Sequence, residues 1–243
     1  MMKLNQHKRD LESEASKKKL EVLQRSDKDD CVSVLVESFM TPHDPIATWI
    51  CESTGNLSEQ ALEKRMRKTL KYVMNGICGT CLKHGVVLGS RDEEGRLVGV
   101  ICCRVPGDPT LTRKEAIRKL LTHGLPPPFP HVFSWGLQSI KRFQSLDTMK
   151  ETSRNLNRKE EKQYWYIEAF GILPEYRGKG LCATFLGCVS KVADDHGHSM
   201  FLETQSASNE GLYKRFGFET VERKNIASAA CTREQHVWFM RRE

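Results

Sequence analysis

Long apolar runs are missing from this chain. No stretch approaches the roughly twenty consecutive apolar residues that a membrane-spanning helix needs, so we expect no membrane partner. The polar start MMKLNQHKRDLESEASKKK also lacks the apolar region of a signal peptide, which argues against export. The nine cysteines are scattered and odd in number, as is typical of reduced thiols, and we therefore expect an intracellular, cytoplasmic and reducing compartment.

A complete set of cysteine ligands for zinc is missing as well. Cys78 and Cys81 have the spacing of zinc ligands, but a zinc site needs a second pair at matching spacing. The adjacent Cys102 and Cys103 fall in a predicted strand, where neighbouring side chains point to opposite faces. We therefore predict that these thiols lie in the core or at the surface, and we expect no metal.

The chain has no concentrated basic region despite its formal net charge of +7, because Lys and Arg alternate with Asp and Glu along most of its length. This pattern indicates a solvated surface, and we expect no nucleic-acid partner. A chain of 243 residues with 39% hydrophobic content is able to bury one core, and nothing requires a second. We predict a disordered, charged tail at residues 1–18 followed by a single domain at 19–243.

Apolar periodicity predicts the elements of the first hundred residues. Apolar residues that recur every three or four positions mark helices, while stretches of branched residues bounded by turns mark strands. The predicted elements are a strand at 20–25, a helix capped by Ser26 or Asp27, a helix over 62–81 that ends at Gly85, and strands at 86–91 and 96–105 joined by a hairpin turn at 92–95.

Residues 107–162 form a variable insertion. TRKEAIRKLL predicts a helix, PPPFP predicts a rigid extended break, and an apolar stripe over 133–149 predicts a second helix. Two roles remain open for this insertion: a structural cover over the sheet, or a wall of the pocket for an acceptor substrate.

Two common phosphate-binding patterns are absent, but a third kind of turn is present. The chain has no Walker loop, and Gly178 and Gly180 lack the third glycine of a GxGxxG fingerprint. Instead, the predicted strand YWYIEAFGI stops at Pro174, and YRGKG opens an amphipathic helix. The unpaired N–H groups at the start of a helix favour an anion such as pyrophosphate, and Arg177 and Lys179 add full charges.

A second strand and a short helix follow this turn. MFLETQ predicts the strand, and Asn209 to Phe216 predicts a helix that is closed by Gly217 and carries Tyr213. Within this helix we expect Leu212 and Phe216 to face the core and Tyr213 to project away from it.

The turn RGKGLC, followed by NEGLYKRFGF, resembles the acetyl-CoA-binding core of the GCN5-related N-acetyltransferase (GNAT) superfamily. YWYIEAFGILPEYRGKGL and FLETQSASNEGLYKRFGF are similar to the puromycin N-acetyltransferase type within it. The resemblance is close over 163–218 and looser over 20–106. It implies an α/β (α+β) GNAT fold, in which helices flank a mixed, mostly antiparallel sheet of about seven strands, and it makes 19–243 one N-acetyltransferase domain.

The resemblance also implies the residues that bind acetyl-CoA. In the family, the strand that matches Phe170 to Ile172 bulges and frees backbone groups for the acetyl and pantetheine moieties. Cys182 stands where the family usually has glycine or alanine, and a cysteine at a helix N-terminus tends to have a lowered pKa. The implied cofactor-binding residues are Phe170, Gly171, Ile172, Arg177, Gly178, Lys179, Gly180, Leu181, Cys182 and Asn209.

Acetyl transfer from a thioester to an amine requires a base, an oxyanion stabiliser and an acid for the departing thiolate. The family's tyrosine at the position of Tyr213 makes it the proton donor. Glu168, which alternation places on the same strand face as Phe170, and Glu203 are the alternative bases; for each, a structural ion pair is the other interpretation. Asn209 either caps the helix of Tyr213 or contacts the cofactor.

These features together predict an enzyme that binds acetyl-CoA, forms a ternary complex and transfers the acetyl group directly to a primary amine of a small molecule. A protein lysine or N-terminal acetyltransferase is the first alternative, because it would have the same cofactor core. A binding module that holds acetyl-CoA without turnover is the second.

Overall fold

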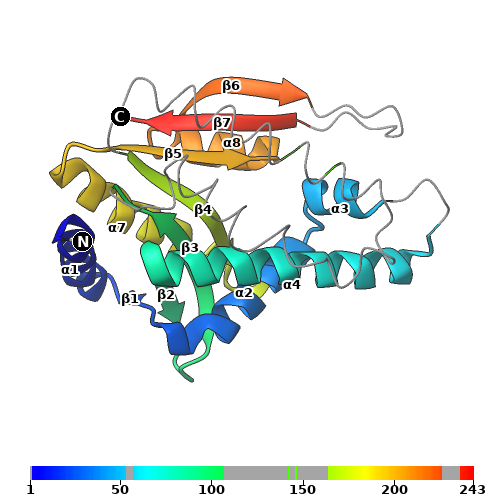
Figure 1. Ribbon diagram of the computed structural model, residues 1–243, viewed down its shortest axis with the longest axis horizontal. Coiled ribbons are helices and arrows are strands. Elements are labelled where there is room, and N and C mark those ends of the chain that lie inside the picture. The colour runs from blue at the N-terminus through cyan, green and yellow to red at the C-terminus, as the bar shows by residue number, and fades with distance from the viewer. Residues whose placement is uncertain (1, 53–56, 107–141, 143–145, 147–163, 226–235) are drawn as a thin grey trace, which may run out of the picture.

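The computed structural model describes residues 2–52, 57–106, 142, 146, 164–225 and 236–243 and contains a seven-stranded sheet (Figure 1). The strand order is β1-β2-β3-β4-β5-β7-β6, and every neighbouring pair is antiparallel except β4 and β5. This is the predicted mixed, mostly antiparallel fold. The strands are β1 Glu21–Val22, β2 Val86–Arg91, β3 Leu97–Arg104, β4 Tyr164–Ile172, β5 Ser199–Thr204, β6 Glu219–Asn225 and β7 His236–Arg242.

Helices cover both faces of the sheet and form a hydrophobic core with each face. The core under α2, α3 and α4 contains Leu35, Trp49 and Leu70, whereas the core under α1, α7 and α8 contains Phe185 and Tyr213. Figure 1 shows α4 running across the front of the sheet. The helices are α1 Met2–Lys17, α2 Lys28–Met40, α3 Pro45–Cys51, α4 Glu59–His84, α7 Leu181–Asp195 and α8 Ala207–Lys214, with 3₁₀ turns η1 Arg25–Asp27 and η3 Pro174–Tyr176. No helix in the described ranges is both long and apolar enough to cross a membrane.

The predicted helix over 62–81 and the hairpin that follows it are confirmed by α4, β2 and β3. Gly85 caps α4 and donates its N–H to the carbonyl of Cys81 at 2.8 Å. A Cβ on Gly85 would lie 2.2 Å from the carbonyl oxygen of Cys103, so only glycine allows the chain to pass so close to β3. Gly95, with φ +80°, turns the hairpin.

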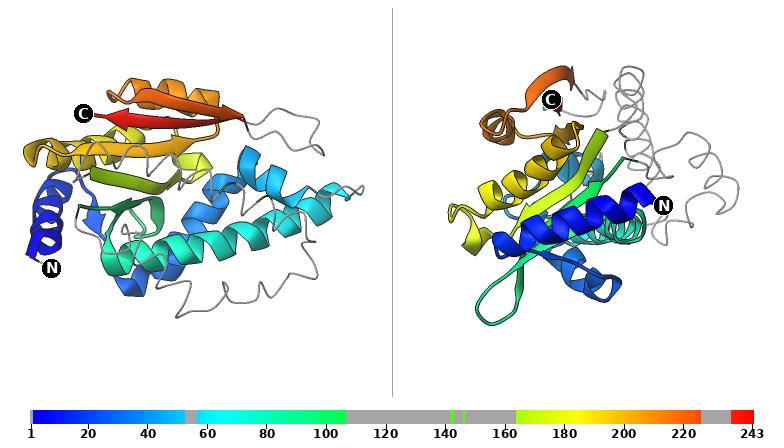
Figure 2. Two further views of the ribbon diagram at one scale, coloured as in Figure 1. Left: turned by 45° about the horizontal axis from the view of Figure 1, so that its top comes forward. Right: turned by 90° about the vertical axis from the view of Figure 1, so that its left-hand side faces the viewer.

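The disorder expected over 1–18 is wrong for the helix α1, which lies beside α7 (Figure 2). Leu11 and Ala15 are fully buried, and His7 packs edge-on against Trp165 of β4 with ring centroids 5.6 Å apart. The charged residues of this segment occupy the remaining faces, so the positions spaced by four form a stripe that the sheet buries. The extent of the single domain, 19–243, stays a prediction.

The helix α3, which follows the cis peptide bond between Thr41 and Pro42, was not predicted from the sequence. Asp44 caps this helix by accepting the N–H of Ala47 at 2.8 Å, and Pro45 stands in its first turn. An Asp-Pro pair is a recognised helix-start signal, so the sequence did contain the evidence. The predicted helices and proline-rich break of 107–162 lie outside the described residues, except for Arg142 and Leu146.

Gly171 in β4 has a packing role that its cofactor assignment did not anticipate. A Cβ at this position would lie 2.1 Å from the hydroxyl oxygen of Ser38 in α2 and 3.1 Å from Cδ2 of Leu35. The glycine therefore permits α2 to rest directly on β4.

We predict that Gly171→Ala lowers the free energy of unfolding by about 1–3 kcal/mol, because the new methyl group overpacks this contact. Urea unfolding measures the change, and the same substitution in a Ser38→Gly background should cost clearly less. Gly76→Ala in α4, where a Cβ meets no atom within 4 Å, is the control and should not destabilise. An equal cost of Gly171→Ala in both backgrounds would contradict this account.

Candidate active site

The two parallel strands at the centre of the sheet separate part-way along their length. Their pairing runs from Tyr164 with Ser199 to Ile167 with Leu202. Beyond this point β4 continues to Ile172, paired with β3, while β5 continues to Thr204, paired with β7. A wedge with unpaired strand edges therefore opens between β4 and β5.

A β-bulge lies at the point where the wedge begins. Cys103 pairs with Ile167 and Cys102 pairs with Ala169, so Glu168 is the extra residue on β4. The bulge reverses the alternation of side chains, because Ile167 belongs to the core under α7 whereas Ala169 belongs to the core under α2. The alternation that placed Glu168 and Phe170 on one face therefore does not hold.

The resemblance had placed the bulge at Phe170 to Ile172, two to four positions too late. These residues pair regularly with Ile101 to Gly99 of β3. Phe170 lies 5.5 Å from Phe185 of α7, measured between ring centroids, and the carbonyl of Ile172 accepts a hydrogen bond from Arg177 at 3.0 Å.

A cavity of about 880 Å³ extends from the wedge to α3 and α4. It brings together side chains from β4, β5 and α8 that are distant in sequence. All three catalytic candidates line it, and so do two of the predicted cofactor-binding residues: Glu168, Glu203, Tyr213, Phe170 and Asn209. The glycine-rich turn at 177–180 does not line this cavity.

Tyr213 is the buried residue of α8, with 9% of its surface exposed. The expected orientation is therefore wrong for Tyr213, which belongs to the core, whereas Phe216 packs against that core and Leu212 is half-buried. Burial raises the pKa of the Tyr213 phenol above its ordinary value, and the nearby Cys182 thiol adds to the effect. No hydrogen bond to this hydroxyl is found within the described residues, so a protonated phenol faces the cavity.

Glu168 forms an ion pair with Arg104, which sequence analysis did not identify. Nε of Arg104 lies 2.8 Å from Oε1 of Glu168, and both side chains are largely buried. The pair spans β3 and β4 beside the bulge, which explains why spacing along one strand did not reveal it. Glu203 lies on the opposite side of the wedge, half-buried on β5.

The turn that opens α7 has the geometry expected of an anion site. Gly178 and Gly180 adopt φ values of +73° and +83°, which favour glycine, and a Cβ on either would meet no atom within 4 Å. Gly180 is the N-cap, and no side chain caps the helix. The N–H groups of Leu181 and Cys182, in the first turn, have no partner within the helix.

Arg177 binds backbone carbonyl groups and thereby attaches the turn to the end of α2. Its guanidinium donates to the carbonyls of Ser38 at 2.8 Å, Ile172 at 3.0 Å and Thr41. Guanidinium N–H groups of Arg177, which we had expected to bind a phosphate group, therefore donate to backbone carbonyls instead. Lys179 is exposed, with Nζ 4.9 Å from the centre of the Tyr176 ring.

Cys182 and Asn209 each differ from one expectation. Burial raises the pKa of the Cys182 thiol to about 11, so the lowered pKa expected at a helix N-terminus is wrong here. Asn209 is exposed within α8, and the N-cap of that helix is Ser206, so the capping interpretation is wrong. The cofactor contact of Asn209 stays a prediction.

The remaining cysteines of the described chain are buried free thiols. Cys102 lies within hydrogen-bonding reach of Cys78 and Cys81, and Cys81 also lines the cavity. No group of three or more potential metal ligands is present among the described residues.

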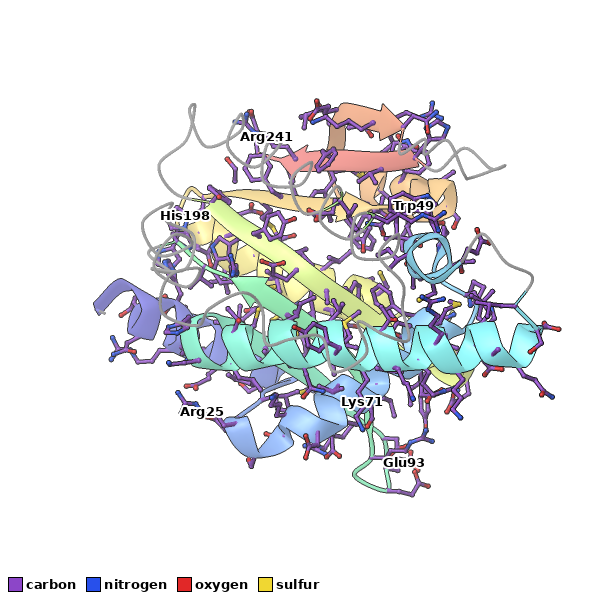
Figure 3. The ribbon with its side chains drawn as sticks, turned by 45° about the vertical axis from the view of Figure 1, so that its right-hand side comes forward. Arg25, Trp49, Lys71, Glu93, His198 and Arg241 are labelled. Atoms are coloured by element: carbon purple, nitrogen blue, oxygen red, sulfur yellow. The ribbon has the colours of Figure 1, made fainter. Side chains whose placement is uncertain are left out.

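Two residues of the insertion, Arg142 and Leu146, are described by the structure. Arg142 is 6% exposed, donates to the carbonyls of Trp49 and Glu52 at 2.5 Å each, and lies 5.5 Å above the Trp49 ring. Leu146 is buried and lines the cavity. Figure 3, in which Trp49 of α3 and Lys71 of α4 are labelled, shows the two helices side by side.

Known proteins are similar to this chain both in sequence pattern and in fold. The model of the acetyltransferase (GNAT) family matches residues 145–218. The search of curated protein sequences found no match.

Solved structures share the fold over most of the chain. Arylalkylamine N-acetyltransferase 2 from Aedes aegypti is 16% identical, with a TM-score of 0.61 over 92% of this chain and 97% of that one. The Drosophila melanogaster polyamine N-acetyltransferase, which forms N-acetylagmatine, is 14% identical, with a TM-score of 0.55 over 91% and 98%. The chain thus has the GNAT fold, and residues 145–218 have the sequence pattern of the GNAT acetyltransferase family.

Proposed function

We propose that this protein is an N-acetyltransferase that transfers the acetyl group of acetyl-CoA directly to a primary amine of a small molecule. The observation that carries the proposal is the cavity at the wedge between β4 and β5, where the protonated Tyr213 and the carboxylates of Glu168 and Glu203 converge. An acid and a base on one cavity are what amine acetylation requires.

The residues around the wedge fit acetyl-CoA. The N–H groups of Leu181 and Cys182, which have no partner within α7 and lie at the positive end of its dipole, suit its diphosphate. The edge of β4 from Phe170 to Ile172, released from β5, suits its pantetheine arm. Acetyl-CoA would supply the acetyl group as a thioester. Asn209 lines the same cavity and is a candidate contact for this cofactor.

Each proton in the reaction has a candidate residue. The phenol of Tyr213 stays protonated because burial raises its pKa, so it is able to donate a proton to the departing sulfur. Glu203 and Glu168 compete as the base that accepts the ammonium proton. Arg104 lies beside one oxygen of Glu168, and both glutamates stay candidates.

Small-molecule acceptors are favoured over proteins by the walls of the cavity. Helices α3 and α4 and Leu146 bound it on the side away from the wedge. Two proteins with the same fold are named for arylalkylamines and for polyamines, which are small amines. The puromycin type and a protein acceptor remain alternatives, and the presence of Tyr213 at the wedge argues against a non-catalytic binding module.

Thiol release from acetyl-CoA tests the proposal. Purified protein is incubated with acetyl-CoA and a panel of amines, aminonucleosides, polyamines and lysine peptides, and we expect turnover with at least one small amine. Turnover restricted to lysine peptides would replace the proposed acceptor class. No thermal shift with coenzyme A at millimolar concentration would overturn the proposal itself.

Tyr213→Phe should lower kcat by about 10²- to 10⁴-fold, because the phenylalanine ring fills the site but donates no proton. Coenzyme A affinity, measured by calorimetry, should change little. Because burial raises the pKa of Tyr213, the wild-type kcat should show no loss from this group up to its ordinary value of 10.0. Tyr176→Phe, outside the cavity, is the control; equal kcat values for the two variants would remove the assignment.

Separate Glu203→Gln and Glu168→Gln variants should distinguish the two bases. We expect the acidic limb of the pH–rate profile, where the base becomes protonated, to disappear in only one of the two variants, which identifies the base. Glu168→Gln should also lower the melting temperature, since it removes one charge of the largely buried ion pair with Arg104. An acidic limb that persists in both variants would exclude both glutamates as the base.

A further inference from the structure

The cavity wall formed by α3 and α4 differs in chemistry from the wedge. Its lining side chains include a continuous set of apolar groups from both helices, completed by Leu146 of the insertion. These apolar residues include Ile46, Ala47 and Ile50 on α3, Leu70, Val73, Met74 and Ile77 on α4, and Leu146.

Three polar residues of this wall hydrogen-bond to backbone groups of the helix they cap or belong to, and Thr69 also lies 3.2 Å from the Cys51 thiol of α3. The hydroxyl of Thr69 donates to the carbonyl of Arg65 at 2.9 Å, and the amide of Asn75 donates to the carbonyl of Lys71 at 2.9 Å. The carboxylate of Asp44 accepts the N–H of Ala47 as the cap of α3. Between the Asp44 carboxylate at the start of α3 and the wedge, the described part of this wall therefore offers a bound molecule mainly hydrocarbon.

Apart from Asp44, the charged groups among the described lining residues come from the strands. Glu168 and Glu203 contribute two carboxylates and Arg104 one guanidinium, from β4, β5 and β3. An ammonium group is thus attracted to the wedge, whereas a second ammonium against the apolar side chains of α3 and α4 would lose water without an equal gain.

Arg142 keeps the apolar wall in place. Its bonds to the carbonyls of Trp49 and Glu52 attach the insertion to the carboxyl end of α3, where a cation is favourable. Ile46 and Ile50, one turn apart on α3, are thereby fixed over the cavity.

We infer that the acceptor is an amine with a single cationic end and an alkyl or aryl body, and not a diamine or polyamine. The inference rests on the proposed function, since it describes the acceptor of that same reaction. The amine binds at the wedge between the carboxylates and Tyr213, and the apolar body binds between α3 and α4.

Matched pairs of amines test the inference on the wild-type protein. Thiol release from acetyl-CoA is measured with butylamine, hexylamine and octylamine and with the diamines of the same chain lengths. We expect kcat/KM of the monoamines to rise with length, by at most roughly fourfold per methylene. Each diamine should be at least about tenfold poorer than its monoamine, because its second charge must lose water.

A charge placed on the apolar wall should reverse this preference. Val73 lines the cavity and is only half-buried, so it tolerates a polar side chain better than a core position. Val73→Asp should lower kcat/KM for octylamine and raise it for 1,8-diaminooctane. Val73→Asn introduces a side chain with the shape of aspartate but without its charge. It should lower kcat/KM for octylamine without raising kcat/KM for 1,8-diaminooctane. Coenzyme A affinity and the melting temperature verify that both variants fold.

The outcomes separate this inference from the proposed function. Diamines that match or exceed monoamines, or monoamine rates that do not depend on length, would overturn the inference and leave the acetyltransferase intact. In the first case Asp44 becomes the candidate partner of the second ammonium. Coenzyme A binding without thiol release for any amine would overturn both.

Discussion

The separation of β4 from β5 is the constraint on which the rest of the site depends. These strands form the one parallel pair of the described sheet, and a parallel pair requires a crossover, here supplied by α7. The first turn of α7 consequently lies just beyond the end of β4. The order β4, α7, β5 therefore brings three features close together: the strand edges where β4 and β5 no longer pair, the first-turn amides of α7, and the cavity. The bulge at Glu168 stands at the start of this separation.

Local sequence predicted the elements whose cause is local. The strand, the turn with Gly178 and Gly180, and the helix that follows were recognised because left-handed glycines and a proline leave clear marks. The helix α4 was equally clear from its apolar period. Tyr213 was assigned through the family resemblance and Glu168 through strand alternation, with Glu203 as its competitor, and the structure gathers all three around one cavity.

The missed features depend on contacts between distant segments. The pairing of Glu168 with Arg104 follows from strand register and the bulge, neither of which is encoded in the spacing of either residue. Arg177 was assigned by its charge, whereas its donors are taken by carbonyls at the end of α2, far away in sequence. The helix α1 was a different kind of miss: its apolar stripe is short, and the many charged residues around it concealed the periodicity.

The packing of α1 has a consequence for how the chain tolerates shortening. Trp165, fully buried at the start of the parallel pair, is covered by His7, and His196 at the end of α7 hydrogen-bonds Asp10 at 2.9 Å. The highly charged first eighteen residues look expendable by composition. Their removal would instead uncover an indole ring beneath the half of the sheet that carries the cavity and loosen the far end of α7, the helix that follows the glycine-rich turn.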